Sequence, residues 1–244
     1  MKRLLVAGAA AVLLPAGAVN ADVLGGGVAL SYWYTSVSGV ARNTLGQTSV
    51  DLDNELDLDS DSSLMASASF EHFMPFLPNV KVGYARVEQT GDSTLVAPFG
   101  QISSGSQVQS QLELTQYDLT LYYEILDNWV NLDLGITARS VDAELVVQAL
   151  TGSITQTDID TVLPLGYAAA RFDLPLTGLS AGAAGNAIAF DGDSLYDLNV
   201  YLQYDVAVMR FQGGYRQIGV DYEDDGELID VRIGGPFISV GVDF

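Results

Sequence analysis

Apolar and polar side chains alternate along most of this sequence, and this alternation limits the possible folds more than any other feature. In the segment 117–125, aromatic and aliphatic side chains occupy every second position, and Asp118, Thr120 and Glu124 lie between them. A period of two is that of a β-strand, because a helix would scatter the same residues around its circumference. The pattern recurs at 130–139, 196–205, 209–216 and 238–244. We therefore predict an all-β protein.

Weaker alternating segments bring the predicted total to about ten strands, within a range of 8 to 12. These weaker segments are 23–37, 63–74, 80–90, 158–172 and 179–190. The connections alternate in length: short turns are predicted at 74–79, 126–129, 173–178 and 205–207, and longer polar loops at 39–62, 91–107, 149–157 and 222–230, with one short connection at 191–194. Short turns at one rim and long loops at the other are typical of a closed antiparallel transmembrane β-barrel.

The polar face of the predicted strands favours lipid as the partner of the apolar face. It carries modest groups such as Asp, Asn, Thr and Gln, which suit a confined lumen, rather than the freely exposed Lys and Glu of a soluble sheet. Aromatic residues are expected in two girdles, with Trp129, Phe172 and Phe244 beside the short turns and the tyrosines Tyr117, Tyr167 and Tyr215 toward the long loops. A membrane-embedded sheet cannot leave an edge unpaired, so the barrel must close. A secreted soluble ligand-binding β-barrel, with its apolar face packed inward, remains an alternative.

The first 21 residues are predicted to be a signal peptide. Lys2 and Arg3 precede the apolar run 4–14, Pro15 interrupts it, and small or modest residues precede Asp22. The apolar run is shorter than the roughly 20 residues that a membrane-spanning helix needs. We expect export through this segment and a single domain over residues 22–244.

Composition excludes several classes of protein. The chain has no Cys, one His, 10 Lys and Arg against 31 Asp and Glu, and a net charge of -21. The absence of Cys excludes disulfide frameworks and thiolate zinc sites, and so few basic residues argue against nucleic acid as a partner. The hydrophobic share of 48% is too high for a disordered acidic tail.

The carboxyl-terminal segment 237–244 alternates in the same way and ends in phenylalanine. Its apolar positions are Ile238, Val240, Val242 and Phe244. Because of this segment, the predicted signal peptide and the series of predicted strands, the chain over residues 22–244 resembles the small outer-membrane β-barrel proteins of Gram-negative bacteria. Ser239 stands where the family usually has glycine. The resemblance implies location in the cell outer membrane, contact with its lipid and lipopolysaccharide, and a terminal strand read by the barrel-assembly machinery. It implies no catalytic residue.

Charged residues on the predicted lumen face are the first candidates for function. They are Glu71, Lys81, Asp118, Glu124, Asp133, Arg139, Asp197, Asp205, Arg210 and Arg216. They could line a narrow, porin-like path whose acidic excess prefers cations. They could instead pair with one another and fill the lumen, because unpaired charge there would be costly. About ten strands enclose little more than side chains, which favours a plug or a very narrow pore.

An acidic stretch in the first long loop is the second candidate. Its carboxylates belong to Asp51, Asp53, Glu55, Asp57, Asp59 and Asp61, with leucines between them. Clustered carboxylates could bind Ca²⁺ or Mg²⁺ and bridge to lipopolysaccharide. Alternatively, the stretch is a solvated loop in which the carboxylates face water and the leucines pack against the protein. No other cofactor is expected.

The single histidine, His72, is the third candidate. An outer-membrane enzyme acting on lipid or peptide would need it near the long loops, yet it lies beside a short turn and shares a face with Leu64 and Phe70. We therefore expect no enzymatic activity. The prediction is a passive outer-membrane barrel, either structural or narrowly conducting, with acidic extracellular loops.

Overall fold

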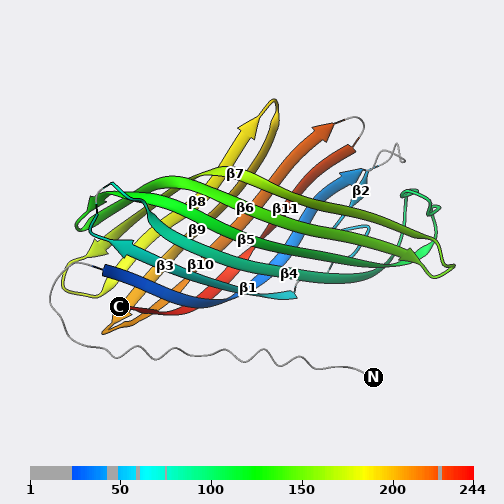
Figure 1. Ribbon diagram of the computed structural model, residues 1–244. Helices are drawn as coiled ribbons and strands as arrows, with labels where there is room; N and C mark the ends of the chain where they lie inside the picture. Colours follow the sequence, from blue (N-terminus) through cyan, green and yellow to red (C-terminus); the bar gives the residue numbers. More distant parts are fainter. Residues whose placement is uncertain (1–23, 43–48, 59–60, 75, 225–226) are drawn as a thin grey trace, which may run out of the picture.

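Ten long strands form a closed antiparallel barrel in the computed structural model, which describes residues 24–42, 49–58, 61–74, 76–224 and 227–244 (Figure 1). The strands are β1 Leu24–Arg42, β3 Asp61–His72, β4 Asn79–Thr94, β5 Gln107–Asp127, β6 Val130–Ala149, β7 Ile154–Leu174, β8 Leu179–Phe190, β9 Asp193–Val206, β10 Met209–Asp224 and β11 Glu227–Asp243; the two-residue β2, Val50–Asp51, pairs with β1. Each long strand pairs with its neighbours in chain order, and β1 pairs with β11 to close the barrel.

The predicted fold class is thus confirmed, with a strand count at the middle of the expected range. The predicted signal peptide, residues 1–21, lies outside the described residues. Within the described ranges, no helix has the length and apolar character needed to cross a membrane.

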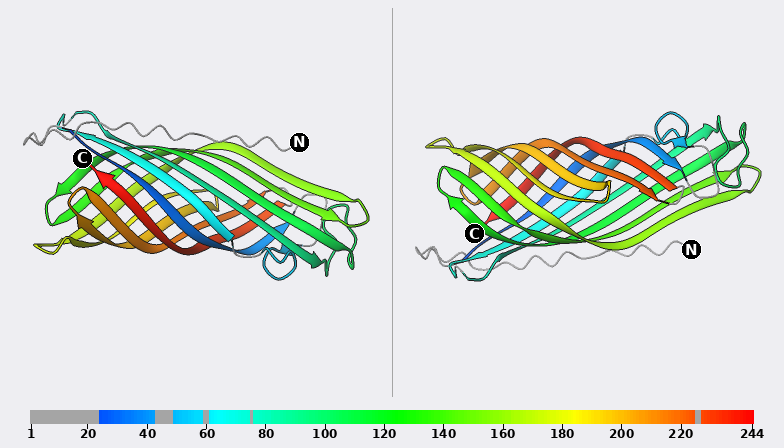
Figure 2. Two further views of the ribbon diagram at one scale, coloured as in Figure 1. Left: turned by 90° about the horizontal axis from the view of Figure 1, so that it is seen from below. Right: turned by 90° about the horizontal axis from the view of Figure 1, so that it is seen from above.

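One rim of the barrel carries the described chain ends, and we call it the inner rim (Figure 2). There the backbone N–H groups of Gly26 and Phe244 each donate to the other's carbonyl oxygen at 2.9 Å. The four connections at this rim, between β3 and β4, β5 and β6, β7 and β8, and β9 and β10, are short, as predicted. We call the opposite end the outer rim.

Apolar side chains cover the outside of the barrel next to the inner rim. Leu119, Leu198 and Val240 are each about half exposed on this surface, at 48%, 49% and 48%. Leu132 is partly covered but lies on the same face of β6 as the exposed Leu134. Because an apolar surface this continuous is unfavourable in water, lipid is its natural solvent.

Several strands are too long to lie wholly within a membrane. β5 and β7 each contain 21 residues and β6 contains 20, whereas roughly 9 to 11 residues cross a bilayer as a tilted strand. The predicted long loops 149–157 and 222–230 are therefore wrong in extent. β6 continues to Ala149 and β7 begins at Ile154, and most of 222–230 belongs to β10 and β11. The outward side chains of these outer strand segments are polar, so their sequences resemble those of polar loops.

The strands that reach the outer half of the barrel exchange their inside and outside polarity along their length. In the inner half of β6, Ile136 points outward and Arg139 points inward, at 65% and 1% exposure. Beyond Ser140 the order is reversed, because Val147 is buried inside and Gln148 is exposed outside. Outside the lipid the strand meets water on its outer face, so the hydrophobic effect turns the apolar side chains inward.

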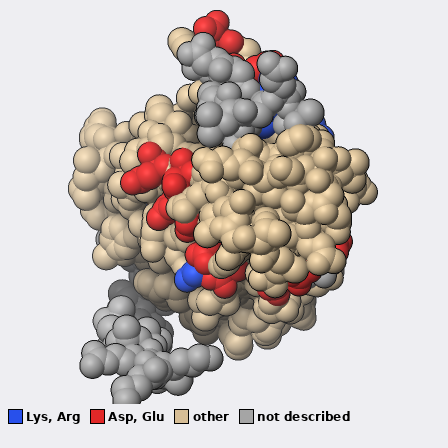
Figure 3. Space-filling model, turned by 90° about the vertical axis from the view of Figure 1, so that its right-hand side faces the viewer, with Lys and Arg blue, Asp and Glu red and all other residues tan. Residues whose placement is uncertain are grey.

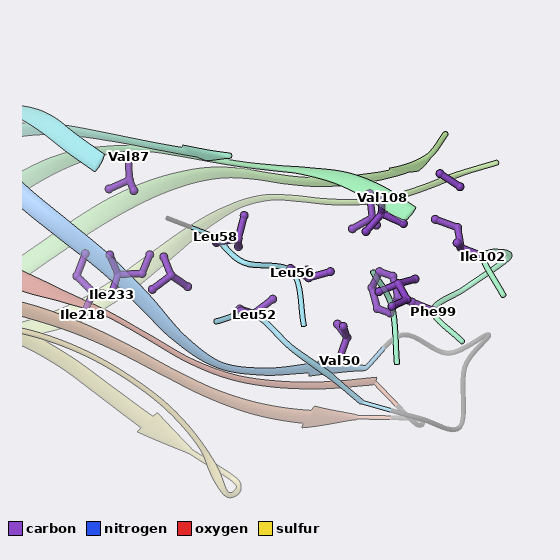
Figure 4. Packing of buried hydrophobic residues seen from close by; sticks show 14 of the residues in the cluster. Val50, Leu52, Leu56, Leu58, Val87, Phe99, Ile102, Val108, Ile218 and Ile233 are labelled. Carbon is purple, nitrogen blue, oxygen red and sulfur yellow. The ribbon is translucent and has the colours of Figure 1, made fainter. Parts of the chain in front are cut away.

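The outer half consequently encloses an apolar core (Figure 4). Trp33 and Val37 of β1, Val87 of β4 and Ile218 of β10 point into it from the wall. The connections 49–58 and 95–106 fold into the same space and fill it with further apolar side chains, namely Val50, Leu52, Leu56, Leu58, Leu95, Phe99 and Ile102. The expectation of a polar lumen is therefore wrong for the outer half and holds only near the inner rim.

The two aromatic girdles are found with one exception. Trp129 and Phe172 are exposed beside the inner rim, and their rings meet edge to face with centroids 5.4 Å apart. Tyr117 and Tyr215 are exposed at 57% and 46%. Tyr167 instead lies inside the barrel at 8% exposure, because it occupies an inward position of β7. Its assignment to a girdle is wrong.

Candidate functional site

Four charged side chains from four strands join in the middle of the lumen. Arg139 of β6 donates from Nε and Nη2 to the two carboxylate oxygens of Asp118 on β5, each at 2.7 Å. The same Nη2 donates to Oδ2 of Asp197 on β9 at 2.6 Å. Arg216 of β10 donates to both oxygens of Asp197, at 2.8 and 2.6 Å. The result is a chain of alternating charge whose formal sum is zero, which we call the charge network.

The charge network crosses the lumen rather than following the wall. β7 and β8 separate β6 from β9 in the sheet, yet Arg139 and Asp197 are in direct contact. Their exposures are 1% and 3%. Buried charges persist only when they are paired and hydrogen-bonded, which the bidentate contacts on both arginines provide. The network therefore ties opposite walls together at the level where the polarity of the barrel changes.

The apolar core lies directly against the charge network. The guanidinium carbon of Arg216 lies 4.9 Å from the ring centroid of Trp33, which is a cation–π contact, and Trp33 is 0% exposed. The indole Nε1 of Trp33 donates to the carbonyl oxygen of Gly235 at 3.0 Å. On the same side of the network, Gln89 donates from Nε2 to the carbonyl oxygen of Thr35 at 3.2 Å. A layer of charge is thus followed outward by a layer of packed apolar side chains.

Polar cavities occupy the inner half. One of about 170 Å³ is lined by charge-network residues and Lys81, and another of about 190 Å³ is lined by Glu71, Lys81, Asp133 and Arg210. Glu71 accepts a hydrogen bond from the hydroxyl of Tyr122 at 2.8 Å. Arg210 pairs with Asp243, with Nη1 and Oδ1 2.9 Å apart.

The remaining predicted lumen charges lie at the inner rim. Glu124 is exposed beside a register shift between β5 and β6, and Asp205 is exposed near the end of β9. Asp205 accepts hydrogen bonds from Gln203 Nε2 at 3.0 and 2.8 Å. The structure therefore brings four of the ten predicted lumen residues into one network, gathers four more around the inner cavity and leaves two at the rim.

The acidic stretch is a turn whose leucines are buried. Hydrogen bonds from the backbone N–H of Asn54 to Asp51 Oδ1 at 2.9 Å, from the Asn54 side chain to Oδ2 at 3.0 Å, and from the backbone N–H of Asp53 to Oδ1 at 3.0 Å lower the pKa of Asp51. Glu55 Oε2 accepts from the backbone N–H of Asp51 at 3.1 Å. The packing predicted for its leucines is confirmed: Leu52, Leu56 and Leu58 are 3%, 0% and 3% exposed.

The metal hypothesis stays a prediction. In the part of the chain that the structure describes, no group of three or more Asp, Glu or His side chains is placed to hold a metal ion. Asp57 has a left-handed backbone with a φ of 52°, and Asp61 begins β3. Asp59 lies outside the described residues.

His72 contacts the backbone of the turn that follows β3. Its Nε2 lies 3.2 Å from the carbonyl oxygen of Pro78, and Nδ1 accepts from the backbone N–H of Met74 at 3.3 Å. The ring also meets Phe70 edge to face, with centroids 6.4 Å apart. These contacts hold His72 at the inner rim as part of a turn.

Sequence reasoning missed the second connection that fills the outer half. Leu95, Phe99 and Ile102 are almost fully buried, although 91–107 was predicted as a polar loop. Phe99 and Ile102 exchange backbone hydrogen bonds at 3.0 and 2.9 Å, which closes a tight turn inside the core. The signal was present, since apolar residues recur within an otherwise polar segment.

No family model matches this chain, and no curated protein matches its sequence. Solved structures do match. The outer membrane protease OmpT from Escherichia coli has a TM-score of 0.59 and 9% sequence identity, covering 91% of this chain and 97% of that one. The translocator domain of the autotransporter NalP from Neisseria meningitidis has a TM-score of 0.48 and 10% identity, covering 92% and 90%. Ail of Yersinia pestis has a TM-score of 0.44 and 11% identity, covering 90% and 99%.

Proposed function

Because the chain has the fold of the outer-membrane β-barrels of Gram-negative bacteria, we propose that it is an integral outer-membrane protein with a sealed lumen. Its role is then structural and passive. The apolar band near the inner rim contacts lipid, and the outer half projects beyond the membrane into the medium. Export by the segment 1–21 and insertion by the barrel-assembly machinery through Phe244 and the strand before it belong to the same proposal.

The observation that carries the proposal is the succession of two closed layers in one lumen. A hydrated cation entering from the inner rim would reach the charge network, in which Arg139 and Asp197 are almost completely buried. It would then meet the core around Trp33 and Leu56, both 0% exposed. Crossing an apolar layer would strip the ion of water without offering oxygen ligands in return. This arrangement supports a plug over a cation-preferring pore.

The outer end presents an acidic surface in this proposal. Figure 3 shows patches of Asp and Glu side chains over the end that carries the outer rim. Contact with lipopolysaccharide through bound Ca²⁺ or Mg²⁺ would use such carboxylates. We also propose that the protein has no enzymatic activity, on the support that His72 belongs to a turn at the inner rim.

Conductance of the refolded full chain in a planar lipid bilayer tests the sealed lumen. Folding is checked first by circular dichroism and by resistance to proteolysis. We expect no current steps at low applied potentials, at which an open water-filled barrel would conduct. A matched variant with Trp33→Gly, Leu56→Gly and Arg139→Gly loses side chains from both layers and should conduct, which demonstrates the sensitivity of the assay. A stable cation-selective current through the unmodified protein would overturn the proposal.

A further inference from the structure

One long stretch of strand edge in the outer half pairs with none of the described strands. β7 pairs with β6 over its whole length, from Phe172 to Ile154. Its pairing with β8 runs only from Leu174 to Gly166, because the β8–β9 hairpin turns back at Asp191 and Gly192. No described strand pairs with the remaining edge, Gln156–Leu165. In Figure 2 the β6–β7 hairpin extends well beyond the tip of β8 and β9. We call this stretch the free edge.

Two other gaps in the described part of the outer wall are covered. β4 continues past the last residue that pairs with β3, and there the turn around Leu56 covers it. Ser93 Oγ donates to the carbonyl oxygen of Glu55 at 2.5 Å, and a Cβ at Gly91 would collide with the carbonyl oxygen of Leu56. At the end of β10, the backbone N–H of Glu223 donates to Asp193 Oδ1 at 3.2 Å. The free edge of β7 differs from both, since among the described residues the loop contact recorded near it is at Thr155, just beyond its outer end.

An unpaired edge offers backbone N–H and C=O groups at every second residue, and it is a template for one more strand. Gln156–Leu165 spans roughly 30 Å at about 3.3 Å per residue. The gap also leaves inward positions accessible: Ile159 points to the inside of the wall, yet it is 37% exposed. An added strand would cover this side chain as well as satisfy the backbone groups.

The side chains along the free edge select what can bind there. Asp158 and Asp160 point outward and stand beside Glu144 and Asp142 of β6 in the sheet register. Like charges on adjacent strands destabilise pairing, so an acidic strand is repelled, including the edge of a second copy of this chain. Lys or Arg side chains of an added strand, placed beside Asp158 and Asp160, would relieve the repulsion that the four carboxylates already exert on one another.

We propose that the free edge of β7 binds an extended cationic peptide segment as an additional antiparallel strand. The basic side chains of this segment lie beside Asp158 and Asp160, and the intervening side chains are apolar or β-branched and cover Ile159. Pro164 has no backbone N–H, so pairing ends where the edge approaches the lipid.

The test uses the full chain refolded in detergent micelles and three fluorescent peptides of about ten residues. The first alternates Lys and Val. The second has the same sequence with alternate backbone nitrogens methylated, which keeps the charge but blocks strand pairing. The third has Glu in place of Lys. We expect fluorescence anisotropy to show binding of the first peptide at least tenfold tighter than that of the other two. Equal binding of the first two peptides would overturn the proposal, because attraction between charges alone would then be responsible.

Two variants locate the binding site. Asp158→Asn together with Asp160→Asn should weaken binding of the Lys–Val peptide by roughly threefold to tenfold. Asp221→Asn together with Asp230→Asn removes the same charge from the β10–β11 hairpin and should leave the affinity unchanged. Hydrogen exchange should show that the bound peptide protects amides in 156–165 but not in 215–224. Equal weakening by both variants, or protection outside β7, would contradict the proposal.

Discussion

Replacing Arg139 by leucine removes the central member of the charge network. Arg139 donates two hydrogen bonds of 2.7 Å to Asp118 and one of 2.6 Å to Asp197. In the variant Asp197 keeps its two contacts with Arg216, whereas Asp118, whose side chain is only 16% exposed, loses its ion pair. An uncompensated buried charge costs about 3–5 kcal/mol. Because Asp118 is not fully buried, we expect a loss near the lower value, about 3 kcal/mol.

The double variant Arg139→Leu with Asp118→Leu separates the cost of the unpaired charge from the value of the pair. It leaves no stranded carboxylate, so its stability should recover to within about 1–2 kcal/mol of the parent protein. Urea unfolding of refolded protein in micelles provides the measurement. The chain contains two Trp, and a Trp129→Phe parent leaves Trp33, which contacts Arg216, as the only reporter.

Two results would refute this reasoning. A loss below about 1 kcal/mol for Arg139→Leu would mean that water reaches Asp118 and that the network is not buried. A double variant as unstable as the single one would mean that the arginine acts by filling space and not through its charge.

Three further perturbations address other parts of the barrel. Leu56→Ala should cost about 2–5 kcal/mol in urea unfolding because the side chain is fully buried, whereas the fully exposed Leu176→Ala should cost almost nothing; equal effects would argue against packing of the first loop. Leu202→Lys places a charge in the lipid-facing band and should lower the free energy of unfolding in lipid vesicles by about 2–4 kcal/mol. Gln148→Lys, in the outer half, should leave this free energy nearly unchanged, and the reverse order of effects would contradict the membrane position. Hydrogen bonds lower the folded-state pKa of Asp51, so its stabilising contribution is present above pH about 4 and is lost as the pH falls through the folded-state pKa. The variant Asp51→Asn should abolish this part of the acid dependence of the free energy of unfolding. An acid dependence identical to that of the parent protein would contradict this role of Asp51.

The sequence was sufficient for the strands that contact lipid. Apolar residues at even positions of 130–138 predicted both the strand and its outward face, because lipid demands an unbroken apolar surface. From Val141 to Ala149 the apolar residues shift to odd positions with no break in the strand. The solvent of the outer face changes at this point, and the phase of the pattern changes with it. A pattern that assumes lipid along the whole outer face assigns these polar outward residues to loops.

The plug was harder to predict because it depends on contacts between distant segments. The leucines of the acidic stretch indicated packing, but their partners on β1, β4 and β10 are set by barrel closure. Tyr167 shows the same limit: the inward face of β7 also carries Leu163 and Leu165, so hydrophobicity alone could not reveal which face meets lipid. The charge network likewise joins strands that are not neighbours in the sheet.

The change of polarity along the strands that reach the outer half is the central claim, and a spin-label scan of β6 tests it most directly. The native chain has no Cys, so single cysteines can be placed at each position of Val130–Ala149 in the refolded protein in lipid vesicles. Labels at outward positions up to 138 should collide mainly with oxygen dissolved in lipid, and labels at outward positions from 140 should collide mainly with a water-soluble nickel complex. The predicted boundary lies near Ser140. Oxygen-dominated collisions at positions 142 to 148, or the absence of a boundary, would contradict the account.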